Sequence, residues 1–374
     1  MPKPIFLHGL EIKGFRPFAH LTLPELSRVN LIVGKNSCGK TSLLEAIQLF
    51  VAEGAVFNIR DLLSSRNEIS AERRGEAEAG QMIGDNLAYE ALFFGRPDLD
   101  LERPELSIAS LGPDATILHV AYCRFIEKIE DSDGQARRRI IIVEREDAAE
   151  GSPAALQVKV GDRERLVPIE IVDRSRRVSR RDLDSPFPFQ YVPADGLSSN
   201  DIARGWDKVT LTAEEGIIYS ALRLVSADIE RVAFVADTRT PYNRYGMTKV
   251  SGQSKPIPLR SLGEGVNHLL GIAVSLIAAR DGLLLVDEIE NGLHYSVMTR
   301  MWKLILDQSR ALNVQVFAAT HSLDCIRGFQ AATAELGFGD ARLIRLEGKS
   351  GNIEGVSFDP AELRIVTEED IEVR

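Results

Sequence analysis

The sequence predicts an α/β fold that carries an inserted antiparallel β-rich region, and three patterns along the chain support this. Near the N-terminus, an apolar strand leads through a glycine-rich turn into a helix, which is the opening half of a parallel α/β unit. In the middle, short runs of alternating apolar and polar residues are separated by turn residues. Towards the C-terminus, helical periods alternate with short apolar strands, as expected for the rest of a parallel sheet.

The parallel α/β unit is expected to form from both ends of the chain. Residues 1–60 contain the predicted strands 5–12 and 29–33 and the predicted helix 40–50. Residues 186–374 are expected to contain the rest of the unit, so that the two segments make one composite domain. The elements predicted there are helices 211–231 and 262–280, strand 283–286, helix 294–312, strand 314–318 and helix 322–336.

Residues 61–185 are predicted to form the insert, whose core is an antiparallel meander. Strands are expected at residues 117–129, 138–144, 156–160 and 166–171. The Asp-Gly and Gly-Asp pairs between these runs are typical of β-hairpin turns, which supports the antiparallel arrangement.

The charge balance narrows the function classes. The chain has 45 basic and 55 acidic side chains, a net charge of −10. This argues against a protein that coats nucleic acid through its overall charge. The segment Arg174–Arg181 nevertheless contains five arginines and no acid. We interpret it either as a solvated loop or as a local basic patch that contacts DNA phosphates or an acidic partner.

The cysteines and the apolar runs indicate the cellular setting. Cys38, Cys123 and Cys325 are far apart and odd in number, so they predict neither a disulfide framework nor a zinc site. The start of the chain lacks the apolar core of a signal peptide, and charges interrupt each apolar run before it reaches membrane-spanning length. We therefore expect a cytoplasmic protein with no membrane partner.

The glycine-rich turn carries the first chemical motif. Residues 34–41, GKNSCGKT, fit the P-loop pattern G-x-x-x-x-G-K-[ST] between a predicted strand and a predicted helix. The glycines let backbone N–H groups surround phosphate oxygens, the lysine reaches the terminal phosphates, and the threonine hydroxyl ligates Mg²⁺. An ordinary glycine turn is the alternative. The predicted ATP-binding residues are Gly34, Lys35, Asn36, Ser37, Cys38, Gly39, Lys40, Thr41 and Ser42.

Two carboxylates follow the apolar strand at residues 283–286. Parallel α/β proteins place ligands at the C-terminal ends of their strands. Asp287 is therefore a candidate Mg²⁺ ligand together with Thr41. Glu288 is a candidate catalytic base that would orient and deprotonate the attacking water. The alternative is that both acids cap the next helix.

A second glycine-rich segment, SLGEG, begins the predicted helix 262–280. A serine and two glycines at a helix start make an anion-binding terminus, which suggests that a nucleotide is held from two sides. A plain helix cap is the alternative. The residues of this segment that are predicted to bind ATP are Ser261, Gly263, Glu264 and Gly265.

One histidine is a further candidate catalytic residue. His321 follows the predicted strand 314–318 within the sequence THS. If that strand lies beside the strand that precedes Asp287, the imidazole would lie near the γ-phosphate. A purely structural histidine is the alternative.

The order of these motifs, namely the P-loop, SLGEG, LLLVDE, ENGLH and THS, resembles the ATP-binding cassette (ABC-type) heads of the SMC, RecF and OLD (overcoming lysogenization defect) ATPases. The resemblance covers residues 1–50 and most of residues 186–346. It implies an ABC-type P-loop ATPase head with a helical signature subdomain, which uses ATP and Mg²⁺. Within this class, DEIENGLH and THS look most like the single-chain AAA-type ATPases of OLD-like defence systems.

The resemblance also implies roles for single segments. SLGEG would be the signature motif, in which Leu262 replaces one glycine of LSGGQ, and it would act on ATP held by the other subunit of a homodimer. Residues 290–294 resemble the D-loop, and His321 resembles the switch histidine. Gln190 is a candidate Q-loop glutamine and a further candidate Mg²⁺ ligand, or a polar strand-edge residue. Phe15 and Arg16 stand where these families often contact adenine, or they pack the sheet.

Three functions are weighed from the sequence. The first is an ATPase that switches a separately encoded effector, such as a nuclease, in an OLD-like anti-phage defence system. The second is a RecF- or SMC-like DNA-repair ATPase with DNA as its partner, although no long coiled coil is evident. The third is a transporter ATPase subunit, and the long separation of Lys40 from Ser261 argues against it, as the family comparison implies.

Overall fold

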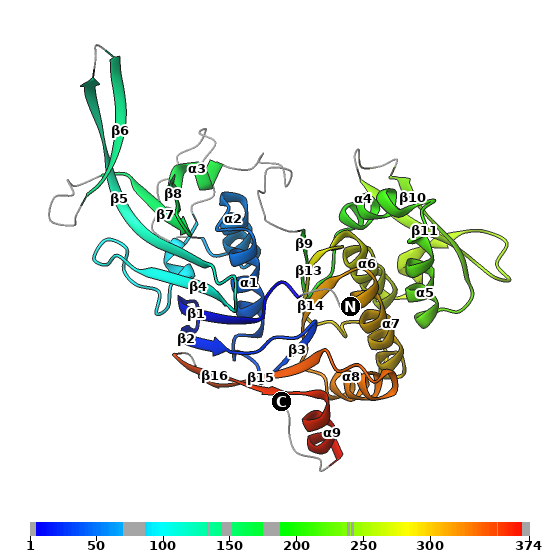
Figure 1. Ribbon diagram of the computed structural model, residues 1–374. Coiled ribbons are helices and arrows are strands. Elements are labelled where there is room, and N and C mark those ends of the chain that lie inside the picture. Colours follow the sequence, from blue (N-terminus) through cyan, green and yellow to red (C-terminus); the bar gives the residue numbers. More distant parts are fainter. Residues whose placement is uncertain are drawn as a thin grey trace.

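The computed structural model describes residues 5–69, 87–132, 135–143, 152–174, 188–237, 240, 243–349 and 351–368. Figure 1 shows two large sheets with helices between and around them, and a smaller sheet at the right-hand side of the view. A long hairpin, formed by β5 (Ile117–Ser132) and β6 (Gln135–Val143), projects from the upper left.

A six-stranded, mostly parallel sheet forms the centre of the molecule. Its strand order is β16–β15–β3–β14–β13–β9, and only β16 is antiparallel to its neighbour. The expected parallel strands at 29–33, 283–286 and 314–318 are confirmed. The strands are β3 (Val29–Val33), β9 (Phe189–Val192), β13 (Gly282–Val286), β14 (Val314–Ala319), β15 (Ala341–Lys349) and β16 (Asn352–Phe358).

A seven-stranded antiparallel sheet lies beside it, in the order β2–β1–β4–β5–β7–β8 with β6 paired to β5. The expected meander is confirmed, except that the strand expected at residues 166–171 ends at Pro168, and residues 169–174 form a helix. The strand expected at residues 5–12 is shifted and joins this sheet as β1. Leu10 and Ile12 are buried while Lys13, between Ile12 and Gly14, is exposed, an alternation that suits an antiparallel sheet covered on one face. The remaining strands are β1 (Gly9–Phe15), β2 (Phe18–Leu23), β4 (Glu105–Leu111), β7 (Ala154–Val160) and β8 (Arg163–Pro168).

Helix α1 (Lys40–Val51) fills the space between the two sheets (Figure 1). All but one of its residues are buried, as expected for a helix that is covered on all sides. Successive side chains of β13 point to opposite faces of the sheet. Leu285 belongs to the hydrophobic core that contains α1, whereas Leu284 and Val286 belong to the core on the other face. The helices of that second core are α6 (Glu264–Ala278), α7 (Met298–Ala311) and α8 (Leu323–Leu336). The central sheet is therefore covered on both faces.

The helix expected at residues 211–231 is shorter than predicted. It ends at Val225, because the following apolar residues alternate with polar ones and pair as a strand from residue 229. Within the described ranges, no helix is both long enough and apolar enough to cross a bilayer. The remaining elements are α2 (Val56–Ser65), α3 (Ile169–Arg174), α4 (Ser199–Val209), α5 (Glu215–Val225), β10 (Ile229–Ala236), β11 (Arg244–Val250), β12 (Ile257–Pro258) and α9 (Pro360–Glu368).

Candidate active site

The first part of the site is the turn between β3 and α1. Gly34 and Gly39 have φ values of 146° and 93°, which residues with side chains rarely adopt. A Cβ atom at Gly39 would come within 2.8 Å of the Phe18 ring. Because glycine avoids this clash, α1 can begin directly after the turn, with the N–H groups of its first turn directed at the loop.

The ammonium group of Lys40 lies inside this turn. Its Nζ atom donates to the carbonyl oxygen of Gly34 at 2.8 Å and to that of Lys35 at 3.3 Å, and the residue is buried. A protonated amine held at a helix N-terminus is placed to bind phosphate oxygens, which form stronger, charge-assisted hydrogen bonds than carbonyls do.

The turn opens onto a cleft of about 670 Å³, here called the P-loop cleft. Most of the predicted P-loop residues line it together with Glu288, whereas Gly34 and Lys35 lie beneath Lys40 and Cys38 is buried. The lining residues are Arg16, Pro17, Asn36, Ser37, Gly39, Lys40, Thr41, Ser42, Arg66, Ala91, Phe93, Gly95, Arg96 and Glu288.

A hydrogen bond joins the P-loop to the end of β13. The Thr41 hydroxyl donates to Asp287 Oδ2 at 2.7 Å. Asp287 is only 4% exposed, and its Oδ1 atom has no hydrogen-bond partner among the described residues. A hydroxyl beside a buried carboxylate with an unsatisfied oxygen provides the hard oxygen ligands that Mg²⁺ prefers. The two residues therefore fit the predicted magnesium site.

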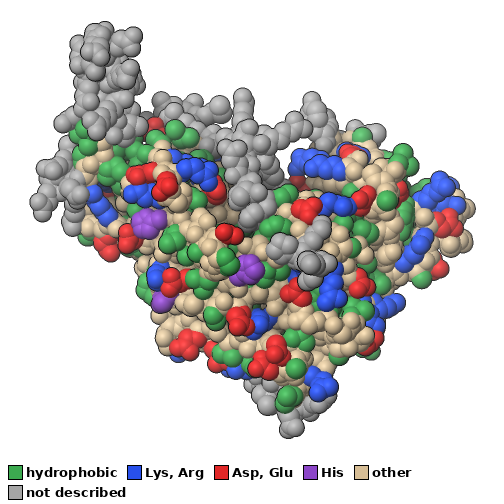
Figure 2. Space-filling view, viewed as in Figure 1, with side chains coloured by type: hydrophobic (Ala, Val, Ile, Leu, Met, Phe, Trp, Pro, Cys, Tyr) green, Lys and Arg blue, Asp and Glu red, His purple; other side chains and the backbone are tan. Residues whose placement is uncertain are grey.

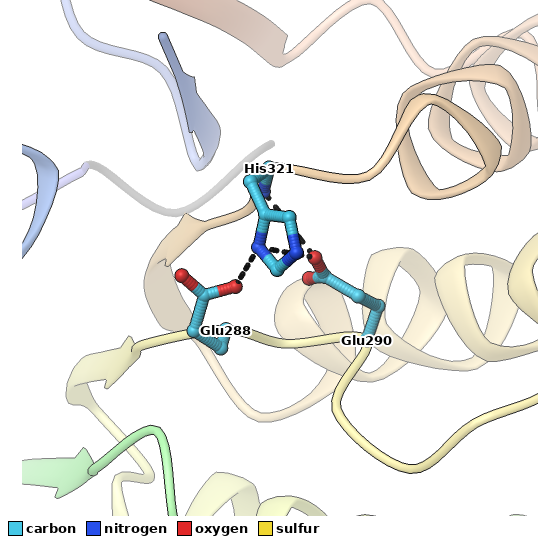
Figure 3. A group of neighbouring side chains, drawn as sticks. All are labelled: Glu288, Glu290 and His321. Atoms are coloured by element: carbon cyan, nitrogen blue, oxygen red, sulfur yellow. Dashed lines mark hydrogen bonds and ion pairs between the residues drawn. The ribbon is translucent and has the colours of Figure 1, made fainter. Parts of the chain in front are cut away.

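Glu288, Glu290 and His321 lie together beside the cleft (Figure 3). Glu288 Oε2 contacts His321 Nδ1, and Glu290 Oε1 lies 3.3 Å from the same nitrogen. The three side chains meet because β13 and β14 are parallel neighbours, so the loops that follow them emerge at one edge of the sheet. Their ligand atoms lie within 4.8 Å of one another, a spacing that would also suit a divalent cation.

The surroundings of Glu288 change its acidity. Burial raises the pKa of its carboxyl above the ordinary value, the negative charge of Glu290 raises that pKa further, and His321 lowers it. A carboxylate with a raised pKa accepts a proton more readily, which is the property required of a general base. Glu288 also has a positive φ of 47°, which is uncommon for a residue with a side chain.

An ion-pair network beside the P-loop was not predicted from the sequence. Arg66 donates from Nη2 to Ser42 Oγ at 3.3 Å, and its Nε lies 2.8 Å from Glu45 Oε1. Arg16 Nε lies 2.9 Å from the other oxygen of Glu45, and Arg16 Nη1 pairs with Glu68. Burial raises the pKa of Glu45 although both arginines oppose this. The signal in the sequence was a single acid within the apolar helix TSLLEAIQLF.

Phe15 and Arg16, the two candidates for a contact with adenine, lie in different surroundings. Phe15 is fully buried in the core between the sheets, which agrees with simple sheet packing. Arg16 has a φ of 51° and lines the P-loop cleft. The structure therefore brings only Arg16 to the cleft.

Gln190 is not brought to the Thr41–Asp287 pair. In the parallel register of β9 and β13 it lies opposite Leu284, three residues before Asp287. At about 3.3 Å per residue this places it about 10 Å away along the strand. Its Nε2 atom donates to the neighbouring carbonyl of Phe189 instead. The strand register therefore argues against a direct Mg²⁺ ligand at this position.

The SLGEG segment lies at the start of α6, and none of its residues lines the P-loop cleft. Ser261, Gly263 and Glu264 are exposed. Gly263 has a φ of 103° at the N-cap of α6, which requires glycine. Gly265 is buried, and a Cβ atom there would lie 2.2 Å from the carbonyl oxygen of Gly292. The segment thus presents an exposed helix start that packs tightly against the loop after β13.

The basic segment at residues 174–181 is only partly described. Arg174 ends α3, and residues 175–181 lie outside the described residues. On the face drawn in Figure 2, described basic and acidic side chains are interspersed. A basic patch at Arg174–Arg181 therefore remains a prediction from the sequence.

Solved structures with a similar fold are SMC heads. The Smc head bound to the C-winged helix domain of ScpA is 16% identical, with a TM-score of 0.52 over 95% of this chain and 98% of that chain. The Smc head of Pyrococcus furiosus, with an extended coiled coil and bound to the C-terminal domain of ScpA, is 13% identical, with a TM-score of 0.50 over 100% of both chains.

Similar sequences agree with this fold. An "ATP/GTP phosphatase" of Helicobacter pylori is 21% identical over 337 residues, which cover 86% of each chain. The "DNA replication and repair protein RecF" of Thioalkalivibrio sulfidiphilus is 43% identical over 58 residues, 16% of each chain. That of Rickettsia massiliae is 44% identical over 48 residues, 13% of each chain.

The fold and the site together define an ABC-type P-loop ATPase head with the fold of SMC heads. Within that class, the chain belongs to the family described as "AAA domain, putative AbiEii toxin, Type IV TA system", which matches residues 29–324. The expected ABC-type head is thereby confirmed, whereas the OLD-like subtype stays a prediction.

Proposed function

We propose that this protein is a Mg²⁺-dependent ATPase in which two heads close around ATP and thereby switch a separate effector. One observation supports the catalytic part above all others: Lys40, Thr41 and Glu288 line one cleft, and Thr41 is hydrogen-bonded to Asp287. The match to an AAA-domain family and the name of the Helicobacter pylori relative support the same activity.

The residues of the cleft suit the binding of a triphosphate. Lys40 would exchange its loop carbonyls for phosphate oxygens, and the N-terminus of α1 would add positive potential. Thr41 and Asp287 would hold Mg²⁺, which neutralises charge on the transferring phosphoryl group when it is bound.

Glu288 would act as the general base. Its carboxylate lines the cleft and would accept a proton from the water that attacks the γ-phosphate. His321 contacts this carboxylate and would orient it. Because the base and its orienting group follow adjacent strands, the rigid sheet fixes their relative position.

The test of this assignment is Glu288→Gln, which keeps the shape of the side chain and removes the base. We expect ATP binding to persist and turnover to fall by at least ~10², the usual scale for loss of a general base. Glu164→Gln, an exposed change on the antiparallel sheet, is the matched control and should leave turnover unchanged. Wild-type turnover of Glu288→Gln would contradict the assignment.

The proposed assembly is a homodimer with composite sites. SLGEG is exposed and does not line the cleft of its own chain, so it would bind ATP held by a second copy. The γ-phosphate would supply the anion that the helix start at Gly263 favours. Closure of the heads would therefore depend on ATP and would reverse after hydrolysis.

The proposed effector is a separately encoded nuclease in an OLD-like anti-phage defence system. The family description names a toxin of a toxin–antitoxin system, which supports a role alongside a second component. The product of the neighbouring gene should bind Glu288→Gln heads more tightly with ATP than with ADP. Equal affinity of that gene product for the heads in the presence of ATP and of ADP would contradict an ATP-dependent switch.

A second candidate function is DNA repair. The local matches to RecF proteins favour it, since they reach 43–44% identity over 48–58 residues. DNA alone, without a protein partner, should then stimulate turnover several-fold. Turnover that responds only to a protein partner would favour the effector switch.

A further inference from the structure

Glu290 is a buried carboxylate that lies outside the P-loop cleft. Its side chain is only 9% exposed, and Oε2 has no hydrogen-bond partner among the described residues. Burying a carboxylate is costly unless its contacts compensate. The other oxygen makes those contacts, because Oε1 accepts the backbone N–H of His321 at 3.3 Å and lies 3.3 Å from His321 Nδ1.

His321, in contrast, is an exposed residue on a loop. Its side chain is 61% exposed, in the short connection between β14 and α8. An exposed side chain on a loop exchanges between rotamers within nanoseconds unless contacts select one of them. Only rotamers that point Nδ1 towards Glu288 keep the contact with the proposed base. In Figure 3 the imidazole is held between the two carboxylates, Glu288 on one side and Glu290 on the other.

We propose that Glu290 is a positioning residue, which fixes the main chain and the ring of His321 so that the imidazole stays against Glu288. A single oxygen that contacts both the backbone nitrogen and the ring nitrogen restrains the torsions between them. This inference rests on the proposed function, because Glu290 acts through His321 and Glu288. It adds a residue whose effect is on turnover and not on ATP binding.

The loop that carries Glu290 is anchored by other contacts. The Ile289 backbone N–H donates to the Ala319 carbonyl at 3.1 Å, and Asn291 Nδ2 donates to the Ala194 carbonyl at 2.7 Å. These bonds hold the loop to β14 and to the segment after β9. Removal of the Glu290 carboxylate should therefore release His321 while the loop stays in place.

The test measures steady-state turnover of Mg-ATP by the full chain. Glu290→Ala should lower kcat by about tenfold or more, because a small misplacement of a catalytic group is costly, while KM changes less than about twofold. Glu290→Gln keeps an acceptor oxygen and should recover most of the lost kcat. Glu290→Met keeps the volume without either oxygen, and should match the alanine variant even if that variant unfolds at a lower temperature.

The double variant Glu290→Ala/His321→Ala separates positioning from a purely structural role. It should be no slower than His321→Ala alone, since two changes on one path are not additive. Additive losses, or a Gln variant as slow as the Ala variant, would overturn the inference and leave the proposed function intact. Wild-type turnover of His321→Ala would overturn the inference together with the proposed role of His321. Only wild-type turnover of Glu288→Gln would contradict the proposed base.

Discussion

The P-loop and the SLGEG segment are two glycine-rich helix starts that share a positive φ at the cap glycine but lie in different surroundings. Gly39 and Gly263 stand at the N-caps of α1 and α6 with φ values of 93° and 103°. A Cβ at Gly39 would collide with Phe18, whereas a Cβ at Gly263 would meet nothing within 4 Å among the described residues. The first is packed into the molecule, and the second is presented to solvent.

This difference shows that a helix N-terminus alone does not make a substrate site. Around the P-loop, Lys40, Thr41 and Glu288 line one cleft, and the buried Asp287 lies behind it, hydrogen-bonded to Thr41. These groups would let a triphosphate and its Mg²⁺ bind to one copy. SLGEG offers a helix start and a serine on an exposed surface. It would gain affinity only for a phosphate that another surface already holds, which is why we assign the two segments separate tasks.

The largest effect should follow from Lys40→Ala. It removes the charged contacts to phosphate, each worth about 1.5–3 kcal/mol. ATP binding should weaken by about 10- to 100-fold, and turnover should be lost with it. Isothermal titration with ATP and Mg²⁺ measures the affinity. Unchanged affinity would show that the P-loop does not bind the nucleotide on its own.

Ser261→Arg should distinguish the task of the SLGEG segment from that of the P-loop. An arginine at the exposed start of α6 adds bulk and a positive charge where an anion is favoured, so composite sites cannot close. Turnover should fall at least about tenfold, the order expected when one ligand of a closed site is lost. ATP affinity of the separated chain should stay at the wild-type value. A loss of affinity equal to that of Lys40→Ala would place SLGEG in the site of its own chain.

A smaller effect is expected in the pH dependence of ATPase activity, and it should arise from Glu288 in the P-loop cleft. Because burial and then the charge of Glu290 raise the pKa of Glu288, more of this residue is protonated in mild acid than for an ordinary glutamate. Activity requires the deprotonated form, so kcat/KM should fall as pH decreases, with a midpoint above the ordinary value of about 4.3. The residual activity of Glu288→Gln should lack this inflection. The same inflection in that variant would assign it to another group.

The last prediction concerns the thiols, whose reactivity should respond to ATP only slightly. Burial raises the pKa of Cys38 and of Cys325, and raises the pKa of Cys123 to about 11. All three should therefore alkylate at pH 8 at least about tenfold more slowly in the native protein than in denaturant. Mass spectrometry of labelled peptides should show that ATP slows Cys38 further and leaves the other two unchanged. Protection of Cys123 or Cys325 by ATP would contradict a nucleotide site at the P-loop.

The parts of the site that were predictable depend on residues close together in the chain. The P-loop turn joins β3 to α1, and Asp287 and Glu288 directly follow β13, so local patterns were sufficient. The distance of Gln190 from the Thr41–Asp287 pair could not be predicted, because it depends on the register of β9 against β13, which no local pattern specifies. From the sequence, Glu290 was assigned only to the segment that resembles the D-loop. Its contact with His321 was not predictable, because the two residues follow different strands.

The ends of the helices and strands also show how far local sequence patterns can predict the structure. Helices α6, α7 and α8 lie close to their predicted ranges because the helical period is strong there. Residues 229–231 were assigned to a helix, yet they begin β10, because pairing with β11 outweighs the local period. The network of Arg16, Arg66 and Glu45 joins three separate segments, so it becomes visible only in the folded chain.

The most direct test of the central claim mixes Lys40→Ala chains with Ser261→Arg chains. Each variant alone has both composite sites broken, whereas a mixed dimer has one intact site, formed by Lys40 of one copy and Ser261 of the other. Random pairing of equal amounts should restore up to about a quarter of wild-type ATPase activity. No recovery, with both variants folded and able to pair, would contradict a site completed by a second copy.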